Sequence, residues 1–138
     1  MHDRIVRVVL VILAAIAVQL GLWATFAPRS FYEDYPGFGR HWVRVDGPYN
    51  EHFVRDFGAL NLALAVVTIA ALVTLGRPLV IAVAIAWLAW SVPHLVYHLR
   101  HLDVFETGDK VLNVFALALL PVLAIVVLAS TIRSPARR

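Results

Sequence analysis

The stretch LVIAVAIAWLAWSVPHLVYHL, residues 79–99, decides the fold of this chain of 138 residues. It contains no Asp, Glu, Lys or Arg, and it has the length of about 20 mainly apolar residues that a helix needs to cross a lipid bilayer. Three more segments meet the same criterion, at residues 5–27, 53–75 and 111–132. They leave one sizeable loop, residues 28–50, and two short connections. We therefore expect a single all-α domain over residues 1–138, an integral membrane protein built as an antiparallel four-helix bundle.

The composition supports a membrane protein and excludes several other classes. Hydrophobic residues make up 61% of the chain and charged residues 15%, whereas soluble domains average about 45–50% and about 25%. This balance excludes a disordered chain and a coiled coil. The net charge of +3 is small, and the basic residues do not cluster with exposed aromatic residues, so nucleic acid is not an expected partner. Since the chain has no Cys, it forms neither disulfides nor thiolate metal sites.

The orientation is predicted from the charges that flank the spans. The first span is too long for the apolar core of about 7–15 residues in a signal peptide, so cleavage is not expected. Lys and Arg divide equally between the two sides of the predicted bundle, while the acidic residues gather on the side away from the termini. On the side of the termini, the basic residues therefore have Asp3 as their one acidic neighbour, and Arg4 and Arg7 lie at the start of the first span. We predict a multi-pass protein of the plasma (inner) membrane with both termini in the cytoplasm.

Histidines gather in the half of the bundle that faces away from the cytoplasm. Five of the six lie there: His41, His52, His94, His98 and His101. The helical period places three of them, His94, His98 and His101, on one stripe of the third span. On the second span, His52 and Asp56 share a face, and Glu51 precedes Arg55 by four residues in the favourable order, acid before base.

These polar faces are expected to meet in one pocket. Because the second span runs inward and the third outward, their outer ends lie at the same depth, and Asn113 of the fourth span starts at a similar level. The predicted pocket occupies the outer third of the bundle, under the loop of residues 28–50. Its candidate metal ligands are His52, His94, His98, His101, Glu51 and Asp56, and its further residues are Arg55, Tyr97, Asn113 and His41.

A divalent transition metal is the first chemical interpretation of this pocket. The spacing of His94 and His98 is a two-ligand spacing on one helix face. Imidazole and carboxylate ligands together suit Zn²⁺, Fe or Cu²⁺. The alternative is structural: His, Tyr and Trp side chains favour the membrane interface, and a hydrogen bond between His94 and Asp56 would join two helices.

Two further functions remain open at this stage. Ionisable groups inside a membrane are candidates for proton chemistry, so a His–Asp pair could act as acid and base on a lipid or quinone-like substrate from the outer leaflet. The other possible function is that of an accessory subunit of a larger membrane complex, or of a homo-oligomer. A metal site requires the histidines to face inward beside Asp56, whereas an interaction protein turns the small-residue stripe of the second span, Ala59, Ala63 and Ala70, outward.

Three polar residues are given structural roles. Asp46, before Gly47 and Pro48, and Asp109 precede the second and fourth spans. Asp accepts hydrogen bonds from the free N–H groups at a helix start, so both are expected to be turn and N-cap residues. Gln19, within the first span, is expected to make an interhelical hydrogen bond.

Three strings carry a resemblance to a known family: FAPRSFYEDYPGFGRHWV at residues 26–43, DGPYNEHFVRDFGALNLA at 46–63 and VPHLVYHLRHLD at 92–103. The chain resembles, over nearly its whole length, a family of small four-span membrane proteins typical of actinobacteria. It is similar in outline, but not in motif, to the DoxX-like four-helix membrane proteins. The resemblance implies a four-span fold and no activity, and it carries over no catalytic residues.

Overall fold

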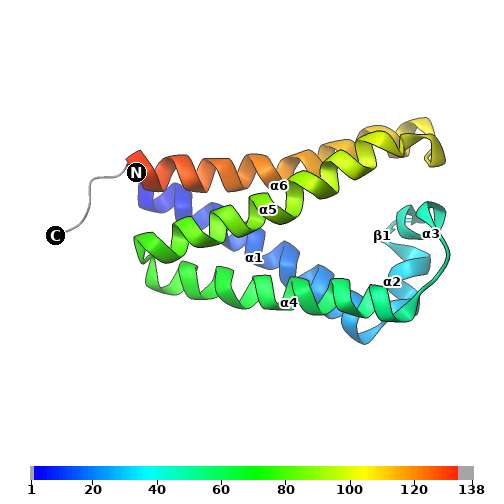
Figure 1. Ribbon diagram of the computed structural model, residues 1–138, viewed down its shortest axis with the longest axis horizontal. Coiled ribbons are helices and arrows are strands. Elements are labelled where there is room, and N and C mark those ends of the chain that lie inside the picture. Colours follow the sequence, from blue (N-terminus) through cyan, green and yellow to red (C-terminus); the bar gives the residue numbers. More distant parts are fainter. Residues whose placement is uncertain (1, 134–138) are drawn as a thin grey trace.

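The computed structural model describes residues 2–133, and it is all-α apart from a two-stranded hairpin (Figure 1). Four long helices form its body: α1 (His2–Phe26), α4 (Glu51–Thr74), α5 (Arg77–Arg100) and α6 (Thr107–Arg133). The segment between α1 and α4 holds α2 (Pro28–Asp34), β1 (Pro36–Gly37), β2 (Arg40–His41) and α3 (Trp42–Asp46). A short 3-10 helix, η1 (Leu102–Val104), lies between α5 and α6.

The four long helices correspond to the four predicted spans. Each is long and apolar enough to cross a membrane by length and composition. Each begins two to four residues before the predicted span, because polar residues at the ends continue the helix beyond its apolar run. At the start of α4, for example, the Asn50 side chain accepts a hydrogen bond of 3.2 Å from the Phe53 N–H. Asn50 is therefore the N-cap of this helix, and not Asp46.

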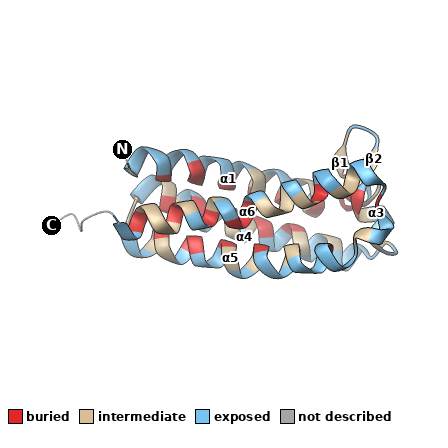
Figure 2. Ribbon diagram, turned by 90° about the horizontal axis from the view of Figure 1, so that it is seen from above, coloured by how far each residue is buried: buried red, intermediate tan, exposed pale blue. Residues whose placement is uncertain are grey.

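The main apolar core fills the half of the bundle nearest the turn between α4 and α5. Its fully buried side chains come from all four helices and include Leu10, Leu13, Ala71, Val83, Trp87, Ala124 and Val127. Figure 2 shows buried residues on the sides of the helices that face one another. Trp87 is the largest of them, and its Nε1 donates a hydrogen bond of 3.0 Å to Thr68 Oγ1. The indole N–H thus finds an acceptor inside the core, as a buried Trp requires.

Two glycines bring α1 and α4 into close contact. A Cβ atom at Gly58 would collide with the backbone and hydroxyl of Thr25, and one at Gly21 would lie 2.8 Å from the Leu62 side chain. The alanine stripe of α4 does not make this contact. Instead, Ala59 and Ala63 are exposed, because the Gly58 side of the helix takes the contact.

The helices separate into two pairs towards the end opposite the α4–α5 turn. In Figure 1, α1 stays beside α4 and α5 stays beside α6, while the two pairs diverge and the segment of residues 28–50 lies at their open end. We call this segment the roof. It begins without a linker, since Pro28 starts α2 directly after α1. Phe31 anchors it, with ring centroids 5.7 Å from Trp23 and 5.6 Å from Phe57.

The glycine contact gives a testable prediction for stability. Gly58→Leu is expected to lower the free energy of unfolding by about 1–3 kcal/mol, because the larger side chain has no space against α1. Thermal unfolding in mild detergent, followed by circular dichroism, measures the change. Ala59→Leu, one residue along on the exposed side, is the matched control and should melt close to the parent. Equal melting temperatures for the two variants would show that α1 and α4 are not in close contact at Gly58.

Candidate functional site: a cavity beneath the roof

A cavity of about 570 Å³ lies between the two diverging helix pairs. All four long helices and the roof contribute to it, with α4 lining it near its start and α5 near its end. Ligand sites for small molecules have volumes of about 300–1,000 Å³ and mainly apolar walls. The size of this cavity therefore suits a small organic molecule.

Aromatic and aliphatic side chains make most of the cavity wall, and a few polar groups interrupt it. The aromatic residues include Phe31, Tyr35, Trp42, Phe57, Trp90 and Phe115, and the polar ones include Gln19, Asp46, Asn50, His94, His98 and Asn113. Among the described residues, no Lys or Arg lines the cavity. Gln19 was expected to join two helices, but its exposed side chain lies at the cavity instead.

Three ring side chains, Trp90, His94 and His98, form a stripe along α5 with the predicted helical period; we call it the ring stripe. Trp90 and His94 stack with their ring centroids 5.2 Å apart, and His94 meets His98 edge-on at 4.8 Å. All three side chains line the cavity. The i, i+4 spacing thus presents two imidazoles and an indole to the interior.

Two buried polar atoms beside the cavity have no hydrogen-bond partner within the described part of the chain. They are Nδ1 of His98 and Oδ1 of Asn113. His98 is 9% exposed and Asn113 is 2% exposed. A buried polar atom without a partner costs about 1–3 kcal/mol, so these two side chains are held in place at a cost in stability.

Asp46 is the acidic group that the structure brings to this cavity, and it was expected to be only a turn residue. The charges of His98 and His101 act on its carboxyl, which also receives a hydrogen bond from Tyr97. Burial raises the pKa of Asp46 above its ordinary value of 3.8, and these three neighbours partly offset the rise. The sequence offers one signal for this position of Asp46: Trp42, Val43 and Asp46 are spaced so that they share a face of the short helix α3, and all three line the cavity.

Asp109 joins the roof to α6. Its Oδ1 accepts hydrogen bonds from the Arg40 guanidinium and, at 3.0 Å, from Trp42 Nε1. The prediction that Asp109 is the N-cap of the fourth span was wrong, because α6 already begins at Thr107. The side chain is therefore free to bind the roof.

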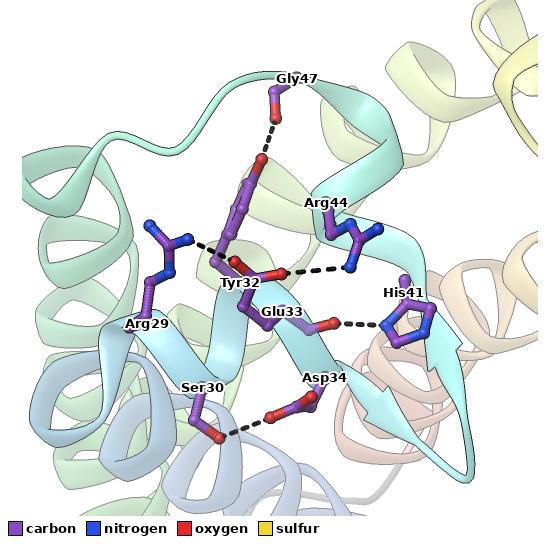
Figure 3. A network of polar contacts seen from close by, with 8 residues as sticks. All are labelled: Arg29, Ser30, Tyr32, Glu33, Asp34, His41, Arg44 and Gly47. Carbon is purple, nitrogen blue, oxygen red and sulfur yellow. Dashed lines mark hydrogen bonds and ion pairs between the residues drawn. The ribbon is translucent and has the colours of Figure 1, made fainter.

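A network of contacts within the roof holds its own parts together (Figure 3). Glu33 forms ion pairs with Arg29 at 2.7 Å and with Arg44 at 3.4 Å. The Tyr32 hydroxyl donates a hydrogen bond of 2.9 Å to the Gly47 carbonyl. These contacts join α2 to the chain at and beyond α3, so the roof is a folded unit and not an open loop.

The polar residues at the start of α4 do not reach the cavity. His52 and Asp56 pair with each other at 3.2 Å and are 79% and 61% exposed at their side chains. Glu51 and Arg55 pair at 2.8 Å, also on the surface. The cause is the rotation of α4: with about 100° per residue, His52 and Asp56 lie about 120° and 160° around the helix from Gly58, which faces α1.

The predicted metal-ligand set therefore does not come together. His101 is exposed and contacts the Tyr97 carbonyl through Nδ1 at 2.8 Å, and His41 is an exposed residue of the roof. Over residues 2–133, no group of three or more His, Asp or Glu side chains is placed to hold a metal ion. Of the predicted site residues, three line the cavity: His94, His98 and Asn113. His98 and Asp46 both line this cavity and their charges interact, so the two groups can donate and accept protons.

The raised pKa of Asp46 predicts a pH dependence. The folded protein keeps the Asp46 proton to a higher pH than the unfolded chain does, so the parent loses stability as the pH rises through the range just above 3.8. Asp46→Asn removes this loss. The melting temperature of the variant relative to the parent should therefore rise as the pH increases above 3.8. Asp103→Asn, an exposed acid at the same end, is the control, and a constant difference for Asp46→Asn would contradict the prediction.

Comparisons with family models, with curated proteins and with solved structures found no match to this chain. The family resemblance of the three strings thus stays a prediction. The functional assignment of the cavity rests on its geometry.

Proposed function

We propose that this protein is an integral membrane protein, an antiparallel four-helix bundle that binds an amphipathic small molecule of the lipid or quinone-like class in the cavity beneath the roof. His98 and Asp46 are its proton-donating and proton-accepting groups, and both chain termini lie on the cytoplasmic side. The observation that carries the proposal is the cavity itself: about 570 Å³, mainly apolar and aromatic, with a few polar residues, among them Asp46, His98 and Asn113, in its lining.

The outer surface of the helices supports the membrane assignment. Large apolar side chains are exposed on every long helix, among them Val8, Val66, Ile85, Val122 and Ile125. In water such a continuous apolar surface would favour association, whereas in a bilayer it faces lipid. The backbone polar groups of these segments are paired within helices, as the interior of a membrane requires.

The position of the cavity supports a ligand that comes from the bilayer. Gln19 of α1 and Phe115 and Leu119 of α6 line the cavity and are also exposed, Phe115 to 67% and Leu119 to 37%. These residues lie between the two helices that diverge beneath the roof. An amphiphile could enter between α1 and α6 from the outer leaflet without disturbing the roof.

Interaction with a further membrane subunit, or with a second copy of the chain, is the second candidate function. The observation that favours it is the outward direction of the α4 stripe, where Ala59 and Ala63 are exposed next to the His52–Asp56 pair. Small exposed residues on a membrane helix allow another helix to approach closely.

Native mass spectrometry of the protein purified in mild detergent tests ligand binding. The parent is expected to retain an amphiphile at near-stoichiometric amount, and Ala116→Trp, which fills the cavity, should lose it. Ala59→Trp places the same side chain on the outer surface and is the matched control. Equal retention by the parent and Ala116→Trp would refute a ligand in this cavity.

Elemental analysis of the same tag-free preparations tests the metal alternative. Near-stoichiometric Zn, Fe or Cu in the parent, lost in both His94→Ala and His98→Ala, would show that the site binds a metal and would overturn the amphiphile proposal. The amphiphile proposal expects no such metal, since within residues 2–133 two imidazoles and no complete ligand set meet at the cavity.

A further inference from the structure

Phe38, at the tip of the β1–β2 hairpin, has the most exposed large apolar side chain of the described residues. It is 100% exposed, whereas the next most exposed, Phe26 and Val73, are 73% exposed. Most of the other exposed apolar side chains lie on the four long helices, where lipid can cover them. Phe38 belongs to the roof, outside those helices, so lipid around the helices does not by itself account for its exposure.

The backbone at the tip holds this ring in an unfavourable conformation. Phe38 and Gly39 form the two-residue loop that joins the strands, and both have a positive φ, 59° and 73°. This sign pattern belongs to the type I′ turn, in which Asn and Gly are the favoured residues. A bulky residue with a positive φ is strained, and strain of this kind is concentrated where proteins make functional contacts.

The tip carries no charge that would oppose its transfer out of water. Residues 35–39 have the sequence YPGFG. The charged residues on either side have partners: Asp34 accepts a hydrogen bond of 3.0 Å from a serine hydroxyl of α2, and the Arg40 guanidinium binds Asp109. The cost of burying a charge therefore does not arise at the tip, while the Phe38 ring gains free energy by leaving water.

The base of the hairpin lies at the level where α6 enters the proposed membrane. Arg40 of β2 binds Asp109 in the first turn of α6. The apolar run that follows, residues 111–132, is about 33 Å long at 1.5 Å per residue, which matches a hydrocarbon core of about 30 Å. Asp109 is therefore at the boundary between hydrocarbon and head groups, and Val111, 66% exposed, begins the apolar surface of α6.

The direction of the hairpin favours lipid as the partner of its tip. Figure 2 shows the hairpin standing out sideways from the helix bundle near its open end. A segment that projects sideways at the head-group level lies over the lipid beside the bundle. A protein partner fits less well, because stable protein interfaces bury about 1,200–2,000 Å², whereas the tip offers a single large side chain.

We infer that Phe38 is a membrane anchor of the roof: its ring inserts among the lipids at the head-group boundary and holds the hairpin against the bilayer. The inference rests on the proposed membrane location, but not on the cavity ligand. The hairpin is continuous with Trp42, which lines the cavity. The anchor therefore attaches the roof of the candidate site to the lipid beside it.

Fluorine NMR of the whole protein in phosphatidylcholine nanodiscs tests the position of this ring. All seven Phe residues are replaced by para-fluorophenylalanine, and Phe38→Leu identifies the Phe38 signal by its loss. Two paramagnetic probes are compared: a phosphatidylcholine with a nitroxide just below the head group, and a water-soluble gadolinium chelate. We expect the lipid nitroxide to broaden the Phe38 signal more strongly than the gadolinium chelate does.

Two further rings calibrate the response to the probes. Phe115, 67% exposed on α6, is the reference for a ring in lipid, and its signal should broaden with the nitroxide. Asp103→Phe adds a ring at an exposed position between α5 and α6 and is the matched control at the same end of the bundle. The added signal should broaden with the gadolinium chelate and not with the nitroxide.

The outcomes separate the anchor from the proposed function. If Phe115 responds to the nitroxide while Phe38 responds as the added ring of Asp103→Phe does, the tip lies in water, and the inference is overturned while the membrane location stands. A Phe38 signal that neither probe broadens would show that protein, such as a second copy of the chain, covers the ring, and would also overturn it. If Phe115 does not respond to the nitroxide, the membrane location itself is refuted.

Discussion

The close contact of α1 with α4 is the constraint from which the rest of the structure follows. Gly58 and Gly21 leave no space for a side chain between the two backbones, so α1 is held against α4 beyond the main apolar core. Towards the open end of the bundle, α1 stays beside α4 while α6 stays beside α5 and diverges from them. The separation that results is filled in part by the aromatic roof, and the remainder is the cavity of about 570 Å³.

The same contact determines which polar residues of α4 can take part in a site. With Gly58 turned towards α1, the opposite face of α4 carries His52 and Asp56 to the surface, where they satisfy each other. The cavity instead takes its acid from the roof, through Asp46, and its amide from α6, through Asn113. Its polar groups thus come from segments that are distant in the sequence.

These features explain which parts could be predicted from the sequence. The four helices follow from long apolar runs, a local property, and only their ends were misplaced because capping residues such as Asn50 extend them. The ring stripe of α5 follows from a period within one helix. The partners of that stripe depend on how α4 is rotated. This rotation depends on the packing of Gly58 against Thr25 and of Gly21 against Leu62, which no local pattern reveals. Asp46 and Asp109 were interpreted as turn and cap residues because both adjoin a glycine, whereas their contacts are with distant side chains.

The attachment of the roof to Asp109 also implies an order of assembly. The roof is synthesised directly after the first helix, but the carboxylate that binds Arg40 and Trp42 belongs to the last one. During synthesis from the N-terminus, α1 and α4 have their glycine contact as soon as both have been made, while the roof lacks its anchor until α6 follows. The cavity is therefore completed last, and a chain truncated before Asp109 would retain the helix pair and lose the cavity.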